Sequence, residues 1–137
     1  MTLATSLPDM MSGLTSDPLD RVHQVRRGLP VEAVEFLLEN ARLTASELDQ
    51  IVLPRKTLAH RRKLGTLTPE QSDRLLRVTR LLATAEETFG NPDKAALWLR
   101  RPTTALGGER PLDLLDTDAG SREVEFLLGR ISHGIAA

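Results

Sequence analysis

The chain has 137 residues, a formal net charge of −1 and no cysteine. Its length suits one domain or two very small ones, and the lack of cysteine excludes disulfides, thiolate metal sites and thiol nucleophiles. Hydrophobic residues make up 40% of the chain but aromatic residues only 3%. Because strands are enriched in aromatic and β-branched side chains, this composition favours helices. We therefore expect an all-α protein built as a small multi-helix bundle.

The first residues of the chain carry no targeting pattern. They lack the basic-then-apolar order of a signal peptide, and no apolar run approaches the roughly 18 residues of a membrane span. We therefore expect a cytoplasmic protein with no membrane partner. Residues 1–16 show no clear periodicity and are expected to form a flexible N-terminal tail.

Four helices are predicted in the N-terminal part of the chain from their start and stop residues. Asp17 and Pro18 form a typical helix start, and Gly28 a typical end. The segment TASE at 44–47 is a capping box, in which threonine and glutamate side chains accept hydrogen bonds from unpaired backbone N–H groups. From these residues and from prolines we predict helices over residues 18–27, 30–40, 45–52 and 54–65.

Three further helices are predicted in the C-terminal part. A second capping box, TPEQ at 68–71, begins the longest helix. Asn91 is expected to cap the next helix, and Thr117 or Asp118 the last one. The predicted helices cover residues 69–89, 92–101 and 118–133, with a glycine-containing loop at 103–111 and a single turn at 112–115.

Residues 44–65 have the spacing of a helix-turn-helix. Two short helices meet across a tight connection at Leu53-Pro54, and in such a pair the second helix lies in the major groove of DNA. This second helix is rich in lysine and arginine and contains no acidic residue. Because a single basic patch binds DNA weakly, we expect a dimer. The alternative is a basic helix that is merely solvated. The predicted DNA-binding residues are Arg55, Lys56, Thr57, His60, Arg61, Arg62 and Lys63.

The sequence contains no pattern of a catalytic or metal-binding site. The three histidines, His23, His60 and His133, are far apart and lack a ligand spacing such as HExxH. No serine is placed as a nucleophile beside a base. We therefore expect no catalytic residue, no cofactor and no metal.

Two further features have structural explanations. Asp113, Asp116 and Asp118 lie close together, and we interpret them as caps of the last helix. Trp98 is interpreted as a core residue, although the arginines that follow it would also fit an interface.

Extended motifs cover the block from residue 72 to residue 134. They are DRLLR (73–77), ALWLRRPTTALGG (96–108), RPLDLLDTDAG (110–120) and GRISHG (129–134). Together they resemble the C-terminal domain of the Xre/MbcA/ParS antitoxins. Upstream, PRKTLAHRRKLG followed by LTPEQSDR resembles the Xre-like helix-turn-helix of the same family. We therefore expect N-terminal helices and this helix-turn-helix at 17–66, and a C-terminal antitoxin domain that binds a toxin at 67–137.

The resemblance implies an antitoxin of a type II toxin–antitoxin system. The partner would be a RES-domain toxin that consumes NAD, and the C-terminal domain would mask its active-site cleft. The chain would also repress its own operon by binding operator DNA, as a homodimer or as a higher hetero-oligomer with the toxin, and would not be an enzyme. The toxin-binding residues would be Arg100, Arg101, Arg122, Leu127, Arg130, Ile131, His133, Gly134 and Ile135.

Two other interpretations remain open at this point. One is a stand-alone helix-turn-helix transcriptional regulator without a toxin partner, whose C-terminal domain only dimerises. The other is a structural adaptor in which the basic helix is a solvated face. An NAD-consuming partner would favour the antitoxin over both, and salt-sensitive, sequence-selective DNA binding would separate the regulator from the adaptor. A catalytic protein is the weakest alternative, because no acid, base and nucleophile can be assembled.

Overall fold

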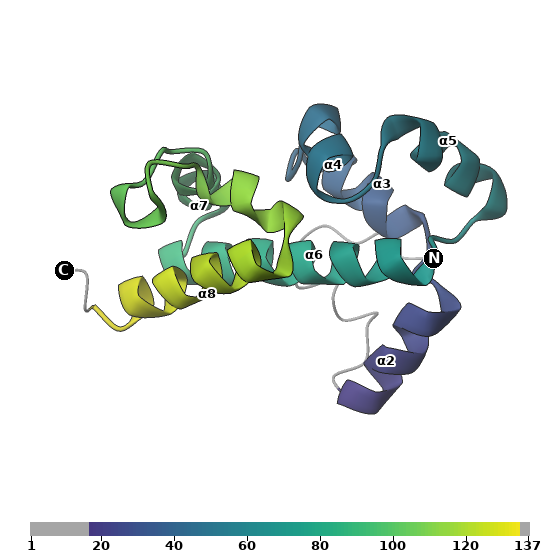
Figure 1. The fold of residues 1–137 in the computed structure, drawn as a ribbon, viewed down its shortest axis with the longest axis horizontal. Coiled ribbons are helices and arrows are strands. Elements are labelled where there is room, and N and C mark those ends of the chain that lie inside the picture. The colour runs from purple at the N-terminus through teal and green to yellow at the C-terminus, as the bar shows by residue number, and fades with distance from the viewer. Residues whose placement is uncertain (1–16, 135–137) are drawn as a thin grey trace. The chain divides into compact units, whose positions relative to one another are not determined.

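The computed structural model describes residues 17–134 and confirms the predicted all-α fold. The only β-type pairing among these residues is an isolated antiparallel bridge between Pro30 and Thr66. The elements in chain order are α2 (Pro18–Arg27), α3 (Glu32–Glu39), α4 (Ala45–Ile51), α5 (Arg55–Leu64), α6 (Pro69–Phe89), α7 (Pro92–Leu99), the 3-10 turns η1 (Thr104–Leu106) and η2 (Pro111–Asp116), and α8 (Asp118–Ser132) (Figure 1).

The chain divides into two compact units, and the division falls within α6. The N-terminal unit ends at Leu76 and the C-terminal unit starts at Arg77. The boundary predicted at residues 66 and 67 lies just before α6, whereas the first turns of this helix belong to the N-terminal unit. The tail predicted at 1–16 lies outside the described residues.

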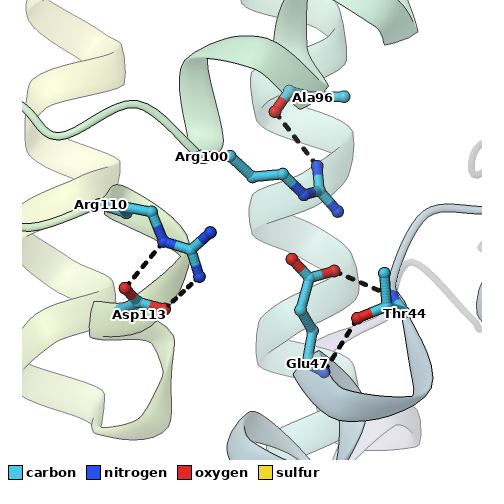
Figure 2. Close-up of polar contacts among 6 residues, drawn as sticks. All are labelled: Thr44, Glu47, Ala96, Arg100, Arg110 and Asp113. Carbon is cyan, nitrogen blue, oxygen red and sulfur yellow. Dashed lines mark hydrogen bonds and ion pairs between the residues drawn. The ribbon is translucent and has the colours of Figure 1, made fainter.

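Side-chain oxygens cap α2, α4, α6, α7 and α8 at the starts that the sequence predicts, whereas α3 and α5 have no side-chain cap and α3 begins at Glu32, two residues later than predicted. Thr44 and Glu47 form the reciprocal capping box of α4, with N···O distances of 2.9 and 3.1 Å (Figure 2). Thr68 and Gln71 form the equivalent pair at α6. Each cap satisfies backbone donors that helix geometry leaves unpaired. The remaining side-chain caps are Asp17 at α2, Asn91 at α7 and Thr117 at α8.

Buried aliphatic side chains form the core of the N-terminal unit. Val34 and Leu37 of α3 have no exposed surface, and Leu58 is the buried residue of α5. In contrast, α2 buries none of its residues, and its apolar Leu19 and Val22 are exposed. The burial of apolar area that stabilises this unit therefore comes from the helices after α2.

Backbone hydrogen bonds join the segment before α3 to the segment after α5. The Val31 N–H donates to the Gly65 carbonyl at an N···O distance of 3.0 Å, and the Leu67 N–H donates to the Leu29 carbonyl at 2.9 Å. These bonds satisfy main-chain groups that a buried loop would otherwise leave without partners. We call the two joined segments, residues 28–31 and residues 65–72, the clasp.

Two side-chain features make the clasp specific. The hydroxyl of Ser72, which has no exposed surface, accepts a hydrogen bond from the Leu29 N–H at 2.8 Å. Gly28 has a φ of +93°, and a Cβ at this position would lie 2.3 Å from the Leu67 carbonyl oxygen. Only glycine fits there, because both the backbone conformation and the space exclude a side chain.

The C-terminal unit is organised around η2, which packs against both α7 and α8. Leu112 and Leu115 of η2 are buried, as are Val124 and Leu128 of α8. A Cβ on Gly120 would lie 2.0 Å from the carbonyl oxygen of Leu114. The first turn of α8 can therefore approach η2 this closely only with glycine at position 120.

Asp113, the first of the three clustered aspartates, forms an ion pair and does not cap a helix. Arg110 donates from Nε and Nη2 to the carboxylate of Asp113, at 2.9 and 2.8 Å (Figure 2). These hydrogen bonds, and then the arginine charge, lower the pKa of Asp113 below its ordinary value. The interpretation of the three aspartates as caps was wrong, because the Thr117 hydroxyl accepts from the Gly120 N–H at 2.9 Å and caps α8. Asp118 instead pairs with Arg122.

Trp98 is half-buried and not the core residue that we expected. On α7 the buried positions are Ala95 and Leu99. The Trp98 ring lies against Phe89 at the end of α6, with ring centroids 5.4 Å apart and planes inclined at 42°. This tilted contact is a favourable aromatic geometry that leaves part of the indole in water.

Replacing Ser72 by alanine should destabilise the chain through the clasp. The Leu29 N–H would remain buried without its acceptor, which costs about 1–3 kcal/mol. The free energy of unfolding, measured by urea titration, should fall by that amount. Ser46→Ala, at an exposed position of α4, is the control and should stay within about 0.5 kcal/mol of the parent chain. Equal effects of the two substitutions would show that the buried hydrogen bond is not what holds the clasp.

Candidate functional site

Helices α4 and α5 follow one another across a tight turn, as predicted (Figure 1). Leu53 in the turn and Leu58 in α5 are 1% and 4% exposed, so both anchor this part of the chain in the core. The side chain of Asp49 in α4 accepts a hydrogen bond from the Arg55 N–H at 2.8 Å. This contact ties the start of α5 to α4, where Pro54 offers no side-chain cap.

The side of α5 opposite Leu58 carries basic side chains. Lys56, His60 and Lys63 are exposed and recur at i, i+4 and i+7, so they share one face of the helix. Arg55 is exposed in the first turn. No acidic residue occurs in α5, so nothing within the helix offsets this positive charge. We call Arg55, Lys56, His60 and Lys63 the α5 face.

The other basic residues predicted to bind DNA make contacts within the N-terminal unit. Arg61 donates from Nε to the Thr66 carbonyl at 2.7 Å. Arg62 donates from Nε and Nη2 to the carboxylate of Glu35 in α3, at 2.5 and 3.3 Å. The hydrogen bond to Glu35 raises the pKa of Arg62 above its ordinary value. These contacts hold α5 in position. Thr57, in the first turn of α5, is half-buried.

A second set of candidate residues lies on exposed positions of α8 and just after it. Arg122, Arg130 and His133 are all exposed. Arg122 donates to Asp118 at 2.8 Å, with the two side chains 77% and 60% exposed. Such an exposed pair contributes little to stability in water, so Arg122 can exchange Asp118 for another acidic partner. The Nδ1 atom of His133 lies 2.9 Å from the Gly129 carbonyl oxygen.

Phe126 lies among these residues and was missed in the sequence analysis. It is 66% exposed and is one turn away from both Arg122 and Arg130. The sequence contained the necessary information, because position 126 falls outside the apolar stripe that includes Val124 and Leu127. A large apolar side chain held in water is a candidate contact residue.

The other predicted toxin-binding residues near the C-terminus differ in exposure. Arg101 and Gly134 are exposed, and Ile131 is half-buried. Leu127 is 8% exposed and belongs to the core of the C-terminal unit. Its contribution to any outer surface is therefore small. Ile135 lies outside the described residues.

Arg100 and the glycine loop after it are structured. Arg100 is half-buried and donates from Nη1 to the carbonyl of Ala96 on its own helix, at 3.1 Å (Figure 2). In the loop, the Gly108 N–H donates to the Thr103 carbonyl at 3.0 Å. Gly107 and Gly108 have φ values of +70° and +84°, a conformation that favours glycine. The loop is thus a hydrogen-bonded turn with a defined shape.

Two other kinds of feature do not occur within residues 17–134. In that range no group of three or more histidine, aspartate or glutamate side chains could hold a metal ion. None of its helices is both long and apolar enough to cross a membrane.

Two family models match the chain. Residues 20–80 match the antitoxin Xre-like helix-turn-helix domain, and this range contains α4, α5 and the α5 face. Residues 84–134 match the antitoxin Xre/MbcA/ParS C-terminal toxin-binding domain, and this range contains Phe126 and the exposed arginines of α8. The family resemblance seen in the sequence is therefore confirmed.

Curated relatives of the chain are antitoxins. "Antitoxin Xre" of Yersinia enterocolitica is 32% identical over 83% of this chain and 79% of its own length. "Antitoxin Xre" of Pseudomonas putida is 39% identical over 72% of this chain and 62% of its own length. "Prs ADP-ribosylating antitoxin" of Sphingobium sp. is 30% identical over 89% of this chain and 84% of its own length. The chain thus belongs to the Xre antitoxin family, with a helix-turn-helix domain followed by a toxin-binding domain.

Proposed function

We propose that the chain neutralises a RES-domain toxin that consumes NAD, by occluding the toxin's active site, and that it represses its own operon in the cytoplasm. It acts by binding and not by catalysis. The observation that carries this proposal is the match of residues 84–134 to a toxin-binding domain in the same chain as a helix-turn-helix. We assign DNA binding to residues 17–66 and toxin binding to residues 67–137.

The name of the Sphingobium relative supports the chemistry proposed for the toxin. That name refers to ADP-ribosylation. ADP-ribose is the part of NAD that remains when nicotinamide leaves, so a toxin that transfers or releases ADP-ribose consumes NAD. A partner of this chemical class is therefore proposed for the present chain.

Occlusion is assigned to the outer side of α8 and to the end of the chain. In this proposal α8 docks on the toxin, and the segment around His133, Gly134 and Ile135 closes the NAD-binding cleft. Arg122 and Arg130, both exposed, pair with acidic groups of the toxin or occupy space that the dinucleotide needs. The weak exposed pair between Arg122 and Asp118 is no obstacle to such a rearrangement.

Operator binding is assigned to α5 in the major groove. Arg55 and Lys56 lie in its first turn, the part of a recognition helix that reaches base edges. Lys63, later in the helix, contacts phosphates. The net charge of the chain is only −1, so attraction to DNA depends on the local charge of the α5 face. Binding should therefore be strongly salt-dependent and should need a homodimer or a larger complex with the toxin.

Replacing Arg55 and Lys56 together by alanine should weaken operator binding. Removing each long basic side chain should make the free energy of DNA binding less favourable by about 1–3 kcal/mol, which is typical of one good interaction with a base. The measurement is a binding isotherm with operator DNA at fixed salt concentration, together with toxin neutralisation in cells, which should survive.

Lys94→Ala is the matched control for this double variant. It removes a positive charge from an exposed position of α7, in the C-terminal unit, and should leave the isotherm unchanged. If the double variant binds the operator as tightly as Lys94→Ala does, the recognition helix lies elsewhere in the chain.

Deleting residues 130–137 should abolish toxin neutralisation while operator binding remains. The deletion removes the last turn of α8 with Arg130 but keeps Val124 and Leu128, which are buried in the C-terminal unit. The readouts are the survival of cells that express the toxin and the operator isotherm. Protection of cells by the truncated chain would contradict occlusion by this segment.

The proposal as a whole is tested by co-expression with the product of the neighbouring gene, followed by affinity purification and an assay of NAD consumption. A stable complex is expected. If the two proteins do not copurify and operator binding persists, the chain is a stand-alone transcriptional regulator, and its C-terminal domain serves only self-association.

A further inference from the structure

The glycines of the described residues fall into groups according to why each is needed. Several have a positive φ, which side chains rarely adopt: Gly28, Gly65, Gly90, Gly107, Gly108 and Gly134. Gly120 has no positive φ, but a Cβ there would lie 2.0 Å from the Leu114 carbonyl oxygen. Gly129 has neither property, because its φ is not positive and a Cβ would have nothing within 4 Å. Gly129 is thus the only glycine within residues 17–134 that neither its backbone conformation nor its surroundings require.

Gly129 is also unfavourable for the helix that contains it. It lies in α8 (Asp118–Ser132) and is exposed. Glycine is a poorer helix former than every residue except proline, because it loses more backbone entropy when it becomes ordered. Alanine would fit the open space and favour the helix. The isolated chain therefore gains nothing from glycine at position 129.

Phe126 is a second, independent observation at the same place. It precedes Gly129 by three residues, so the two positions are neighbours on the helix surface. Its side chain is 66% exposed, although burying an aromatic ring is one of the largest apolar gains available to a chain. The large Phe126 ring therefore lies next to Gly129, which has no side chain, on the surface of α8. We call this pair of residues the step.

Arg122 and Arg130 flank the Phe126 ring at i−4 and i+4. Both are exposed, as is Glu123 on the same side of the helix. An apolar centre with charged groups at its edge is the arrangement of protein–protein contact sites, and aromatic residues and arginine are the side chains enriched in them. A nucleic acid is a poorer match, because Glu123 and Glu125 are exposed on the same helix.

We propose that Phe126 and Gly129 form the docking point of α8 on the toxin. The Phe126 ring enters an apolar pocket of the toxin, and the toxin backbone approaches α8 over Gly129, where a methyl group would prevent contact. This inference rests on the proposed function, and it is continuous with the toxin-binding domain matched at residues 84–134. It explains why a residue that weakens α8 is present at an exposed helical position.

The test compares three single variants of the full chain: Gly129→Ala, Phe126→Ala and Glu87→Ala. The last is a control at an exposed position of α6, outside α8. For each variant, the Kd for the purified RES-domain toxin, the Kd for operator DNA, and the Tm and oligomeric state of the chain alone are measured.

Gly129→Ala should have opposite effects on the free chain and on the complex. The Tm of the chain alone should rise by a few degrees or stay constant, because alanine favours the helix. The Kd for the toxin should rise at least about tenfold, because the added methyl group keeps the toxin backbone away from a central contact position. Phe126→Ala should raise that Kd by a similar or larger factor without lowering the Tm. All operator affinities should remain unchanged.

Three results would overturn the inference. If the parent chain does not bind the toxin, the proposed function fails and the inference fails with it. If the parent chain binds and both variants bind equally well, the proposed function stands and only the docking point is wrong. If both variants change the oligomeric state of the chain alone and leave the Kd for the toxin unchanged, the step on α8 is a contact between copies of this chain.

Discussion

The hydrogen bond from the Leu29 N–H to the buried Ser72 hydroxyl, at 2.8 Å, is the contact on which the N-terminal unit depends. It fixes the segment before α3 onto the beginning of α6, while the backbone pairing of Val31 with Gly65 and of Leu67 with Leu29 joins the same segment to the end of α5. The ends of α3, α5 and α6 are thereby set relative to one another. The position of the α5 face within the N-terminal unit is fixed as a consequence, although none of its residues belongs to the clasp.

The basic residues of α5 divide into two roles. Arg61 and Arg62 contact Thr66 and Glu35 and hold the helix, whereas the α5 face carries charge outward. A similar division holds in α8, where Val124 and Leu128 are buried while Phe126 and Gly129 are exposed. In both helices, the residues that stabilise the fold are different from those assigned to binding. Variants of the second kind can therefore change binding without unfolding the chain.

Most of the secondary structure was predictable because it is determined locally. The capping boxes at Thr44 and Thr68, and the glycine and proline positions, act over three or four residues and are visible in the sequence. The failures concern contacts between distant segments. Nothing near Ser72 indicates that its partner is Leu29, and the half-burial of Trp98 follows from where Phe89 lies. Phe126 is a different case, because its position outside the apolar stripe of α8 is visible in the sequence and was overlooked.

We propose, in short, that this Xre-family chain inhibits an NAD-consuming toxin with its C-terminal unit and binds DNA with its helix-turn-helix. The most direct measurement is NAD loss catalysed by the purified RES-domain toxin during titration with the full chain, with and without operator DNA. NAD loss should fall in proportion to the chain added and stop when all the toxin is bound. DNA should not relieve this inhibition, since the α5 face and α8 belong to different units. Undiminished NAD loss by toxin that is in stable complex with the chain would contradict this proposal.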